Sequence, residues 1–350
     1  MTNPSSASRV WKRWKIGLKT VDGEGPSIAE PAEDVVKYGQ IGHVAIVGTG
    51  VIGASWGAYF LAKGLRVSAT DPAPGAEERL RDAVSQHWPT LERIGLAAGA
   101  SQDNLSVHSE LANALRDVDF VQESGPERED LKLELFKAMD AAVPGSVVIA
   151  SSSSGLLMSR IQTACAHPER IVLGHPFNPP HLIPLVEVIG GEQTSAAAIA
   201  TAMSFYRAIG KRPINPKKEV KGHIANRLQA ALWREAIHLV SIGAASVADI
   251  DDAIAYGPGL RWAAFGPFLN LHLSGGRGGI EHILDHLGGP IETWWDDLGD
   301  PRLTSEVKAR IAAGVLDELA GRSSASIEAH RDALVLALLE AKAASDAVDL

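Results

Sequence analysis

The sequence is short of the residues that mark several classes of protein. It has one cysteine, Cys165, so no disulfide bond can form within the chain. That composition is typical of proteins in the reducing cytoplasm, which is the location we expect. No uninterrupted apolar run reaches about 18 residues, so we expect no transmembrane helix and no membrane partner.

Basic side chains are also in deficit. The chain has 33 basic and 42 acidic residues, which gives a formal net charge of −9. Domains that bind nucleic acids usually present a basic face, so this balance argues against a nucleic-acid partner. Aromatic residues are scarce as well, at 5%, although eight tryptophans outnumber seven phenylalanines and four tyrosines. Half of the tryptophans fall in two short stretches, at positions 11, 14, 294 and 295.

The first 40 residues are predicted to form an N-terminal extension. They hold serine, proline and glycine clusters and no strand-like run. Segment 9–19 alternates basic with apolar residues, which fits a transit-type segment or a surface anchor. The interpretation we favour is a flexible arm, or an arm packed on the body of the protein. The apolar stretch of about 7–15 residues that a signal peptide needs is missing.

Residues 41–218 are predicted to form an α/β domain. Short apolar runs alternate with helical patterns, which predicts a Rossmann-type, doubly wound, mostly parallel sheet. The predicted strands are 43–47, 66–70, 118–122, 146–151, 170–175, 185–189 and 212–215. The predicted helices are 51–63, 75–96 with an interruption at Pro89, 129–142, 156–166 and 194–209.

Residues 219–350 contain no strand-like run, so they are predicted to form an all-α C-terminal domain. The expected helices are 222–242, 246–254, 276–287 and 304–345. The total length of 350 residues fits two domains, with a core large enough to need no metal. No metal site is therefore expected.

A glycine-rich turn after the first strand predicts a dinucleotide site. The turn reads Gly48-Thr49-Gly50-Val51-Ile52-Gly53 and opens a helix. Gly48 allows the tight turn, Gly50 lets the backbone approach a pyrophosphate, and Gly53 lets helix and strand pack closely. Backbone N–H groups of the helix N-terminus, at Val51 and Ile52, then face the phosphates.

The second strand ends at Asp71, 18 residues after the last of these glycines. A carboxylate at this place accepts hydrogen bonds from a ribose 2′-hydroxyl and repels a 2′-phosphate. No lysine or arginine follows within seven residues. The cofactor is therefore predicted to be NAD rather than NADP.

A histidine and a glutamate suggest acid–base chemistry. His175 ends a predicted strand, where ligands of open α/β sheets bind. Glu187 is an acid inside an apolar strand and needs a partner. A carboxylate fixes the tautomer of an imidazole and stabilises its protonated form. Such a pair can remove a hydroxyl proton while a hydride leaves the same carbon, so we predict that both residues are catalytic.

These motifs resemble the L-3-hydroxyacyl-CoA dehydrogenase superfamily, and within it the carnitine dehydrogenase group, with the gulonate 3-dehydrogenase (λ-crystallin) group next. The similar stretches are 47–53, 71–75, 122–128, 151–157, 174–180, 184–188, 217–229, 231–240 and 259–263. The resemblance implies an NAD-dependent dehydrogenase that oxidises a 3-hydroxyl group, and it also implies a homodimer.

The resemblance also implies roles for further residues. His175 and Glu187 match the catalytic histidine and its acidic partner, and Ser154 matches a serine that hydrogen-bonds the reacting oxygen. The run of four serines leaves its register open by one, with Ser153 as the alternative. Asn226 matches an asparagine that contacts the substrate. Two charged residues match positions that contact the cofactor, namely Glu127 and Lys132.

The substrate is predicted to be a small free L-3-hydroxy acid, carnitine-like or gulonate-like. Members that act on CoA thioesters carry lysines after the second strand, as the resemblance implies. Here residues 72–105 have no lysine, three arginines and five acids, a poor match for a triphosphorylated ligand. A trimethylammonium group would favour aromatic faces, and Trp262 and Phe265 are candidates, as are Trp294 and Trp295. These aromatic residues could equally pack in the core or at a subunit interface.

Two alternatives remain. One is an L-3-hydroxyacyl-CoA dehydrogenase that acts on a CoA thioester. The other is a non-catalytic nucleotide-binding or structural protein, against which the intact set of His175, Glu187, Ser154 and Asn226 argues.

Overall fold

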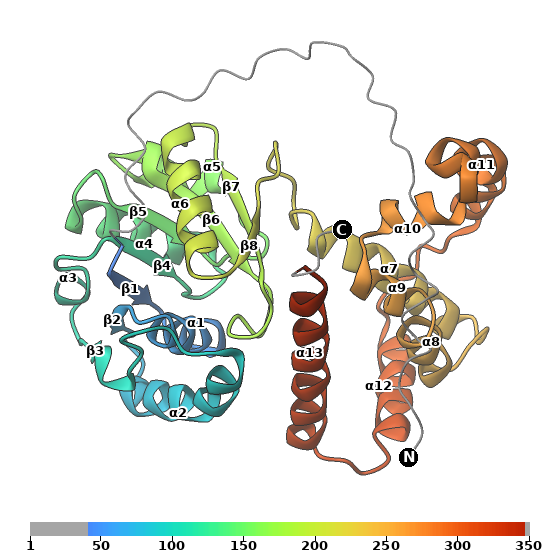
Figure 1. The fold of residues 1–350 in the computed structure, drawn as a ribbon, viewed down its shortest axis with the longest axis horizontal. Helices are drawn as coiled ribbons and strands as arrows, with labels where there is room; N and C mark the ends of the chain where they lie inside the picture. The colour runs from blue at the N-terminus through green and yellow to red at the C-terminus, as the bar shows by residue number, and fades with distance from the viewer. Residues whose placement is uncertain (1–40, 347–350) are drawn as a thin grey trace, which may run out of the picture. The chain divides into compact units, whose positions relative to one another are not determined.

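The computed structural model describes residues 41–346, so the predictions for residues 1–40 lie outside the described residues. An eight-stranded sheet with the order β3-β2-β1-β4-β5-β6-β7-β8 forms the first part of the described chain (Figure 1). Its strands are β1 (His43–Val47), β2 (Arg66–Thr70), β3 (Leu105–Val107), β4 (Phe120–Glu123), β5 (Val148–Ser151), β6 (Ile171–Pro176), β7 (Leu185–Gly190) and β8 (Arg212–Ile214).

Strands β1 to β6 pair in parallel. β7 runs antiparallel to β6, and β8 pairs in parallel with β7. The helices in this region are α1 (Val51–Ala62), α2 (Ala76–Ile94), α3 (Leu111–Ala114), α4 (Glu129–Ala142), α5 (Met158–Ile161) and α6 (Ala196–Ala208). This arrangement confirms the predicted Rossmann-type, mostly parallel sheet.

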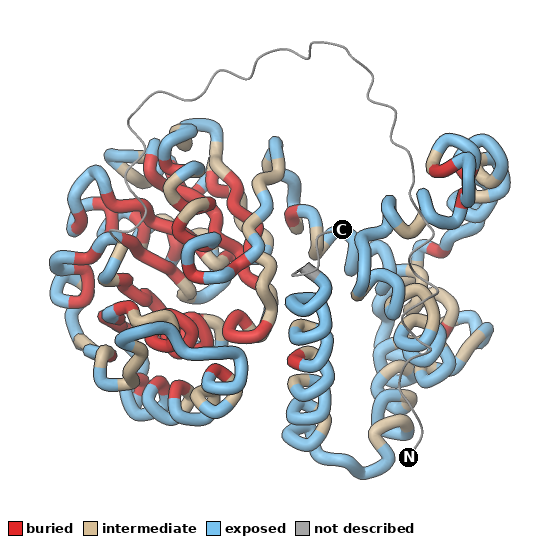
Figure 2. The backbone as a smooth tube through the Cα atoms, viewed as in Figure 1, coloured by how far each residue is buried: buried red, intermediate tan, exposed pale blue. Residues whose placement is uncertain are grey.

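The core has two halves because side chains alternate between the faces of the sheet. Val44 and Ile46 of β1 belong to one buried cluster, whereas Ala45 and Val47 belong to the other. In the first cluster, Trp56 of α1 stacks on the aromatic ring of Tyr206, with 5.7 Å between centroids. Figure 2 shows buried residues concentrated along the strands and along the inner sides of the helices that cover them.

The chain after β8 is helical throughout the described part, as predicted for the C-terminal region. Its helices are α7 (Ala225–Ser241), α8 (Val247–Ala255), α9 (Pro258–Ala264), α10 (Pro267–Ser274), α11 (Gly279–Asp297), α12 (Ser305–Leu319) and α13 (Ser324–Asp346). Helix α8 begins at a capping box. The Ser246 side chain accepts a hydrogen bond from the Asp249 N–H, and the Asp249 side chain accepts one from the Ser246 N–H. Within residues 41–346, no helix is long and apolar enough to cross a membrane.

Several expectations about the elements were wrong. Helices α3, α9 and α10 were not predicted, and the helix expected at 276–287 is α11, which continues to Asp297. Helix α2 continues through Pro89, whose one lost hydrogen bond is offset by the burial of Val84 and Leu91 on either side. The helix predicted over 304–345 is two helices, because Ala320 and Gly321 adopt left-handed conformations, with φ of 48° and 78°. The expected helix 156–166 is α-helical only over the four residues of α5. Strand β3 was missed, because three residues give too short a pattern.

Candidate active site

The glycine-rich turn has the backbone geometry of a dinucleotide site. Gly48 has φ of 93°, and a Cβ added to it would lie 2.7 Å from backbone atoms of Ser124 and Gly125. A Cβ on Gly53 would overlap the carbonyl oxygen of Gly48. Gly50 has open space where a Cβ would stand, so a phosphate can approach its backbone. The residues present therefore fit a bound dinucleotide.

Asp71 lies beside this turn, directly after β2. One carboxylate oxygen accepts a hydrogen bond from the Thr49 N–H at 2.8 Å, and the other accepts one from the Ala73 N–H at 2.9 Å. These bonds fix the carboxylate at the edge where an adenosine ribose would bind. At the start of α1, the Val51 side chain is 74% exposed, which leaves the helix N-terminus accessible to phosphates.

His175 and Glu187 face each other across the antiparallel pair β6 and β7. The strand register places them directly opposite, and His175 Nδ1 lies 3.0 Å from a carboxylate oxygen of Glu187. Both side chains are buried. A carboxylate only accepts, so Nδ1 carries the proton and Nε2 of His175 is left as the acceptor. The predicted pair is therefore assembled by main-chain hydrogen bonding.

The carboxylate of Glu187 also accepts hydrogen bonds from the start of α7. The N–H groups of Ile224 and Ala225 donate to it at 2.9 Å and 3.1 Å. Burial by itself would raise the pKa of this carboxyl, but the hydrogen bonds from His175 and from these two N–H groups outweigh burial. The pKa of Glu187 therefore lies below its ordinary value, and the group stays ionised beside the imidazole.

The two candidate serines lie in different surroundings. The Ser154 hydroxyl lies 3.2 Å from His175 Nε2 and is exposed. Ser153 is 1% exposed, and its hydroxyl donates to Glu127 at 2.7 Å. Ser153 therefore does not line the cavity beside His175, whereas Ser154 does.

Glu127 holds the serine loop in place. One of its carboxylate oxygens accepts the Ser153 hydroxyl and also the N–H groups of Ser154 at 3.1 Å and Gly155 at 2.8 Å. Its carboxylate is thus engaged by protein groups, although the residue is exposed.

Asn226 meets the serine loop from α7. Its side-chain amide donates to the Ser154 carbonyl at 3.4 Å. A cavity of about 230 Å³ lies among these groups. It is lined by Ile52, Ser152, Ser154, His175, Pro176, Phe177, Asn178, Asn226 and Gln229. One residue of the dinucleotide turn and three predicted catalytic residues therefore share a single cavity.

Three other predicted residues lie elsewhere. Lys132 is 1% exposed, and its ammonium contacts both carboxylate oxygens of Glu123, at 2.7 Å and 2.8 Å. It supports the loop after β4 rather than presenting a free charge. Trp262 and Phe265, on α9 and directly after it, are each 43% exposed, and neither is among the described residues that line the catalytic cavity.

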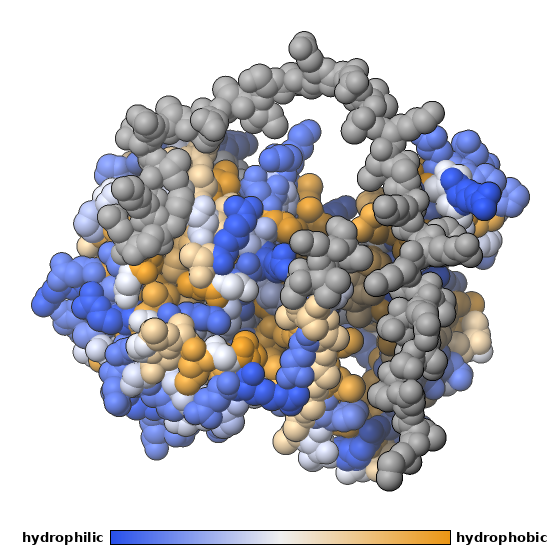
Figure 3. All heavy atoms as spheres, viewed as in Figure 1, coloured by the Kyte–Doolittle hydropathy of each residue, from blue (hydrophilic) through white to orange (hydrophobic). Residues whose placement is uncertain are grey.

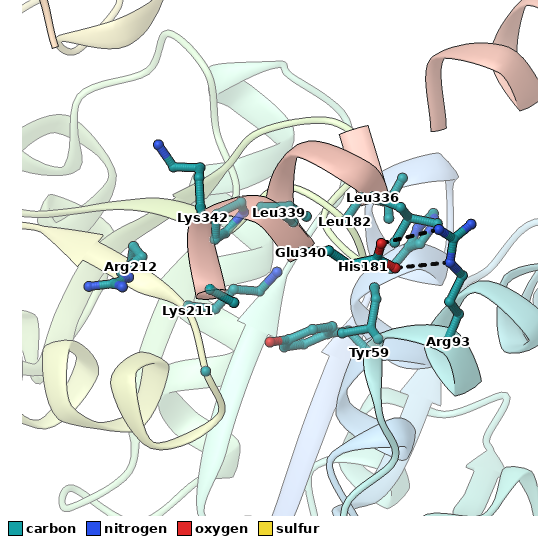
Figure 4. Close-up of a pocket in the computed structure, with 14 residues that line it drawn as sticks. Tyr59, Arg93, His181, Leu182, Lys211, Arg212, Leu336, Leu339, Glu340 and Lys342 are labelled. Atoms are coloured by element: carbon teal, nitrogen blue, oxygen red, sulfur yellow. Dashed lines mark hydrogen bonds and ion pairs between the residues drawn. The ribbon is translucent and has the colours of Figure 1, made fainter. Parts of the chain in front are cut away.

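A larger cavity, of about 350 Å³, contains none of the predicted site residues. Tyr59, His181 and Lys211 line it from the sheet region, and Leu336 from α13 (Figure 4). The Lys211 ammonium donates to the carbonyl oxygens of Pro180 and Ile183. Burial holds the pKa of Lys211 well below its ordinary value. Its hydrogen bonds support the chain that follows His175.

Several residues of the site were missed in the sequence, among them Phe177 and His223. Phe177 lines the cavity, and its ring lies 5.2 Å from that of His175, edge to face. Because Phe177 lies two residues after a histidine at the end of a strand, the sequence could have indicated that it borders the site. His223 is buried, and the centroid of its ring lies 5.2 Å from that of His175. It precedes the predicted Asn226 by three residues, and only the fold brings it to His175.

Comparison with known proteins agrees with this geometry. The family model for the 3-hydroxyacyl-CoA dehydrogenase NAD-binding domain matches residues 43–220, and the model for the C-terminal domain matches residues 222–310. The chain belongs to the 3-hydroxyacyl-CoA dehydrogenase family. This membership confirms the predicted NAD cofactor and an NAD-dependent oxidoreductase that acts on a CH–OH group.

Several relatives of the chain are L-carnitine dehydrogenases. The protein of that name from Streptomyces coelicolor is 54% identical over 298 residues, which covers 85% of this chain and 94% of the relative. The one from Pseudomonas aeruginosa is 48% identical over 297 residues, 85% of this chain and 92% of the relative. The predicted resemblance to the carnitine dehydrogenase group is confirmed.

A solved structure is also similar to most of the chain. It is 5-formyl-3-hydroxy-2-methylpyridine 4-carboxylic acid 5-dehydrogenase, described as an NAD⁺-dependent dismutase. Its TM-score is 0.74 at 29% identity, and the match covers 85% of this chain and 97% of that one.

Proposed function

We propose that the protein oxidises the 3-hydroxyl group of L-carnitine, or of a closely similar free L-3-hydroxy acid, to the 3-oxo acid. The observation that supports this best is the single cavity in which His175, Ser154 and Asn226 meet the dinucleotide turn. The high identity to L-carnitine dehydrogenases supports the choice of substrate.

In the proposed mechanism, the dinucleotide turn would hold NAD⁺, which when bound would supply the acceptor for the hydride from C3 of the substrate. Nε2 of His175 takes the hydroxyl proton, since Nδ1 is already protonated toward Glu187. The ionised Glu187 then stabilises the imidazolium that forms. The Ser154 hydroxyl and the Asn226 amide orient the substrate oxygen, because both lie at the rim of the same cavity. In the reverse direction His175 returns the proton.

We assign the trimethylammonium group to the ring of Phe177. An aromatic face attracts a quaternary ammonium, which has no N–H group with which to donate a hydrogen bond. Phe177 is the aromatic side chain that borders the cavity at His175. Trp262 and Phe265, proposed from the sequence, do not border this cavity in the described chain, so we rank them below Phe177.

A CoA thioester is a poorer fit. The three arginines between β2 and β3 are already engaged. Arg79 donates to the Pro74 carbonyl, Arg81 pairs with Glu77, and Arg93 pairs with Glu340, as Figure 4 shows for the last pair. A CoA phosphate would have to displace these contacts, in a segment that carries more acidic than basic residues.

We propose further that the protein works as a homodimer in the cytoplasm. Helices α7 to α13 leave many large apolar side chains exposed, among them Trp233, Phe268, Leu269, Trp294 and Trp295. Figure 3 shows hydrophobic residues at the surface of this region. Apolar area on this scale favours association with another copy. The single cysteine supports the proposed location.

The test is a substrate panel read by NADH formation at saturating NAD⁺. L-carnitine, L-gulonate, L-3-hydroxybutyrate and L-3-hydroxybutyryl-CoA are compared by kcat/KM. We expect L-carnitine to exceed the CoA thioester by at least about 100-fold, since binding and orientation differ by several contacts. Preference for the CoA thioester would overturn the proposed substrate, and absence of turnover with all four would overturn the assignment as a 3-hydroxy acid dehydrogenase.

A further inference from the structure

His223 occupies an unusual place just before α7. Its backbone has φ of 53°, in the left-handed region, and it follows Gly222, which has φ of 78°. A non-glycine residue is uncommon in that region, so the turn must be held by its surroundings. The imidazole is 2% exposed and has no contact with bulk solvent through Nδ1. The turn thus adopts an unfavourable backbone conformation in order to bury the polar ring of His223.

The hydrogen bonding of this ring defines its protonation. Nε2 of His223 lies 3.3 Å from the carbonyl oxygen of Ser153. A carbonyl only accepts, so Nε2 carries the proton and donates. Nδ1 is buried without a partner among the described residues, so it is the unprotonated nitrogen. His223 is therefore a neutral hydrogen-bond donor.

The groups around His223 favour this neutral state. Burial lowers the pKa of His223, and the adjacent His175 lowers it further. The carboxylates of Glu187 and Glu127 act in the opposite direction but do not cancel burial. A neutral ring 5.2 Å from His175 does not oppose the positive charge that His175 acquires in the reaction.

The turn at residues 222–226 makes hydrogen bonds to two catalytic residues. The N–H groups of Ile224 and Ala225 bind Glu187, and the Asn226 amide binds the Ser154 carbonyl. His223 adds a further hydrogen bond from the turn, to the carbonyl of Ser153. Because Ser153 immediately precedes Ser154, this bond also acts on the serine loop. Of the two side-chain contacts that the turn makes with the serine loop, the one from His223 is buried, whereas the one from Asn226 is exposed and borders the cavity.

From this arrangement we propose that His223 is a positioning residue for the oxidation. By donating to the Ser153 carbonyl, it holds the serine loop together with Glu127, so that the Ser154 hydroxyl stays within hydrogen-bond distance of His175. The proposal rests on the proposed function, in which Ser154 and His175 act on the substrate hydroxyl. His223 itself exchanges no proton with the substrate.

The kinetic test compares His223→Phe, which keeps a ring but loses the donor, with His223→Gln, whose amide reaches a similar position. The control is His330→Phe, at an exposed site on α13. We expect His223→Phe to lower kcat about tenfold, the size of one lost hydrogen bond, with the affinity for NAD changed less than twofold. His223→Gln should recover most of kcat, and His330→Phe should match the wild type.

A deuterium isotope effect at C3 separates positioning from damage to the fold. Misplacement of the Ser154 hydroxyl slows the chemical step, so the isotope effect on kcat should rise in His223→Phe. Partial unfolding would instead lower kcat and leave the isotope effect unchanged. A His223→Phe variant with the kcat of the wild type would overturn the proposal. So would a loss of kcat that His223→Gln does not restore and that leaves the isotope effect unchanged.

A second measurement does not depend on turnover. The ¹⁵N shifts of His223 in the full-length protein should show Nε2 protonated and Nδ1 unprotonated between pH 6 and 8. A doubly protonated ring in this range would overturn the proposal. Failure of the substrate panel alone would leave this result intact, so the two hypotheses fail separately.

Discussion

The sheet region and the helical region of this chain differ in how they treat their apolar residues. In the sheet region most large hydrophobic side chains are buried in two clusters. In the described helical region, by contrast, the buried hydrophobic residues are Val240, Ile283 and Leu336. Twenty-one residues after position 220 are instead large, hydrophobic and exposed. The sheet region thus carries His175 and Glu187 on its own core, whereas the helical region leaves many large apolar side chains exposed.

The largest expected effect sharpens the role of the sheet region. His175→Asn removes the proton acceptor while leaving β6 and its pairing with β7 in place. Turnover should fall at least about 100-fold, because general-base catalysis contributes that much or more. NAD binding, measured by calorimetry, should be unchanged, because the dinucleotide turn is intact. Full activity in this variant would show that the proton is taken by another group.

The next effect concerns the helical region. Trp294→Glu combined with Trp295→Glu places two charges on α11, where the tryptophan side chains are 62% and 63% exposed. Burying such charges at a subunit interface is costly, so light scattering should show monomers in place of dimers. Lys137→Glu, an exposed change on α4 of the sheet region, is the matched control and should stay dimeric. An unchanged mass in the double variant would place the interface elsewhere.

The smallest effect is a pH dependence of stability in the sheet region. Burial lowers the pKa of His181 to about 3, with His87 and Lys211 acting in the same direction. Between the ordinary value of 6.5 and this one, the unfolded chain binds more protons, so stability falls as pH falls. His181→Gln removes this penalty.

Urea unfolding at pH 7 and pH 5 measures the difference. The wild type should lose on the order of 1–2 kcal/mol more than His181→Gln over this interval. His282→Gln, an exposed change on α11, should behave like the wild type. Equal losses in all three proteins would mean that His181 titrates normally.

The sequence allowed much of the sheet region to be predicted. Helix α4 has the predicted bounds, and the pairing of His175 with Glu187 followed from an acid that needed a partner inside an apolar strand. Such inferences succeed because a strand register and a glycine turn impose local rules.

Other features depend on tertiary contacts that no local pattern in the sequence encodes. The resemblance matched Lys132 to a position that contacts the cofactor, yet its side chain is buried against Glu123, nine residues earlier. The placement of Trp262 and Phe265 away from the catalytic cavity depends on how α9 packs. His223 is recognised only when the turn before α7 lies against Ser153, 70 residues away. No periodicity records such contacts.

The antiparallel pairing of β6 with β7 has a consequence for how this protein can change. Because the ladder itself sets His175 opposite Glu187, the eight-residue connection from Phe177 to Pro184 is not needed to align them. That connection can lengthen, shorten or change its side chains, and the dyad keeps its spacing as long as the ladder keeps its register. New substrates can therefore be accommodated by rebuilding one loop, without re-inventing the acid–base machinery.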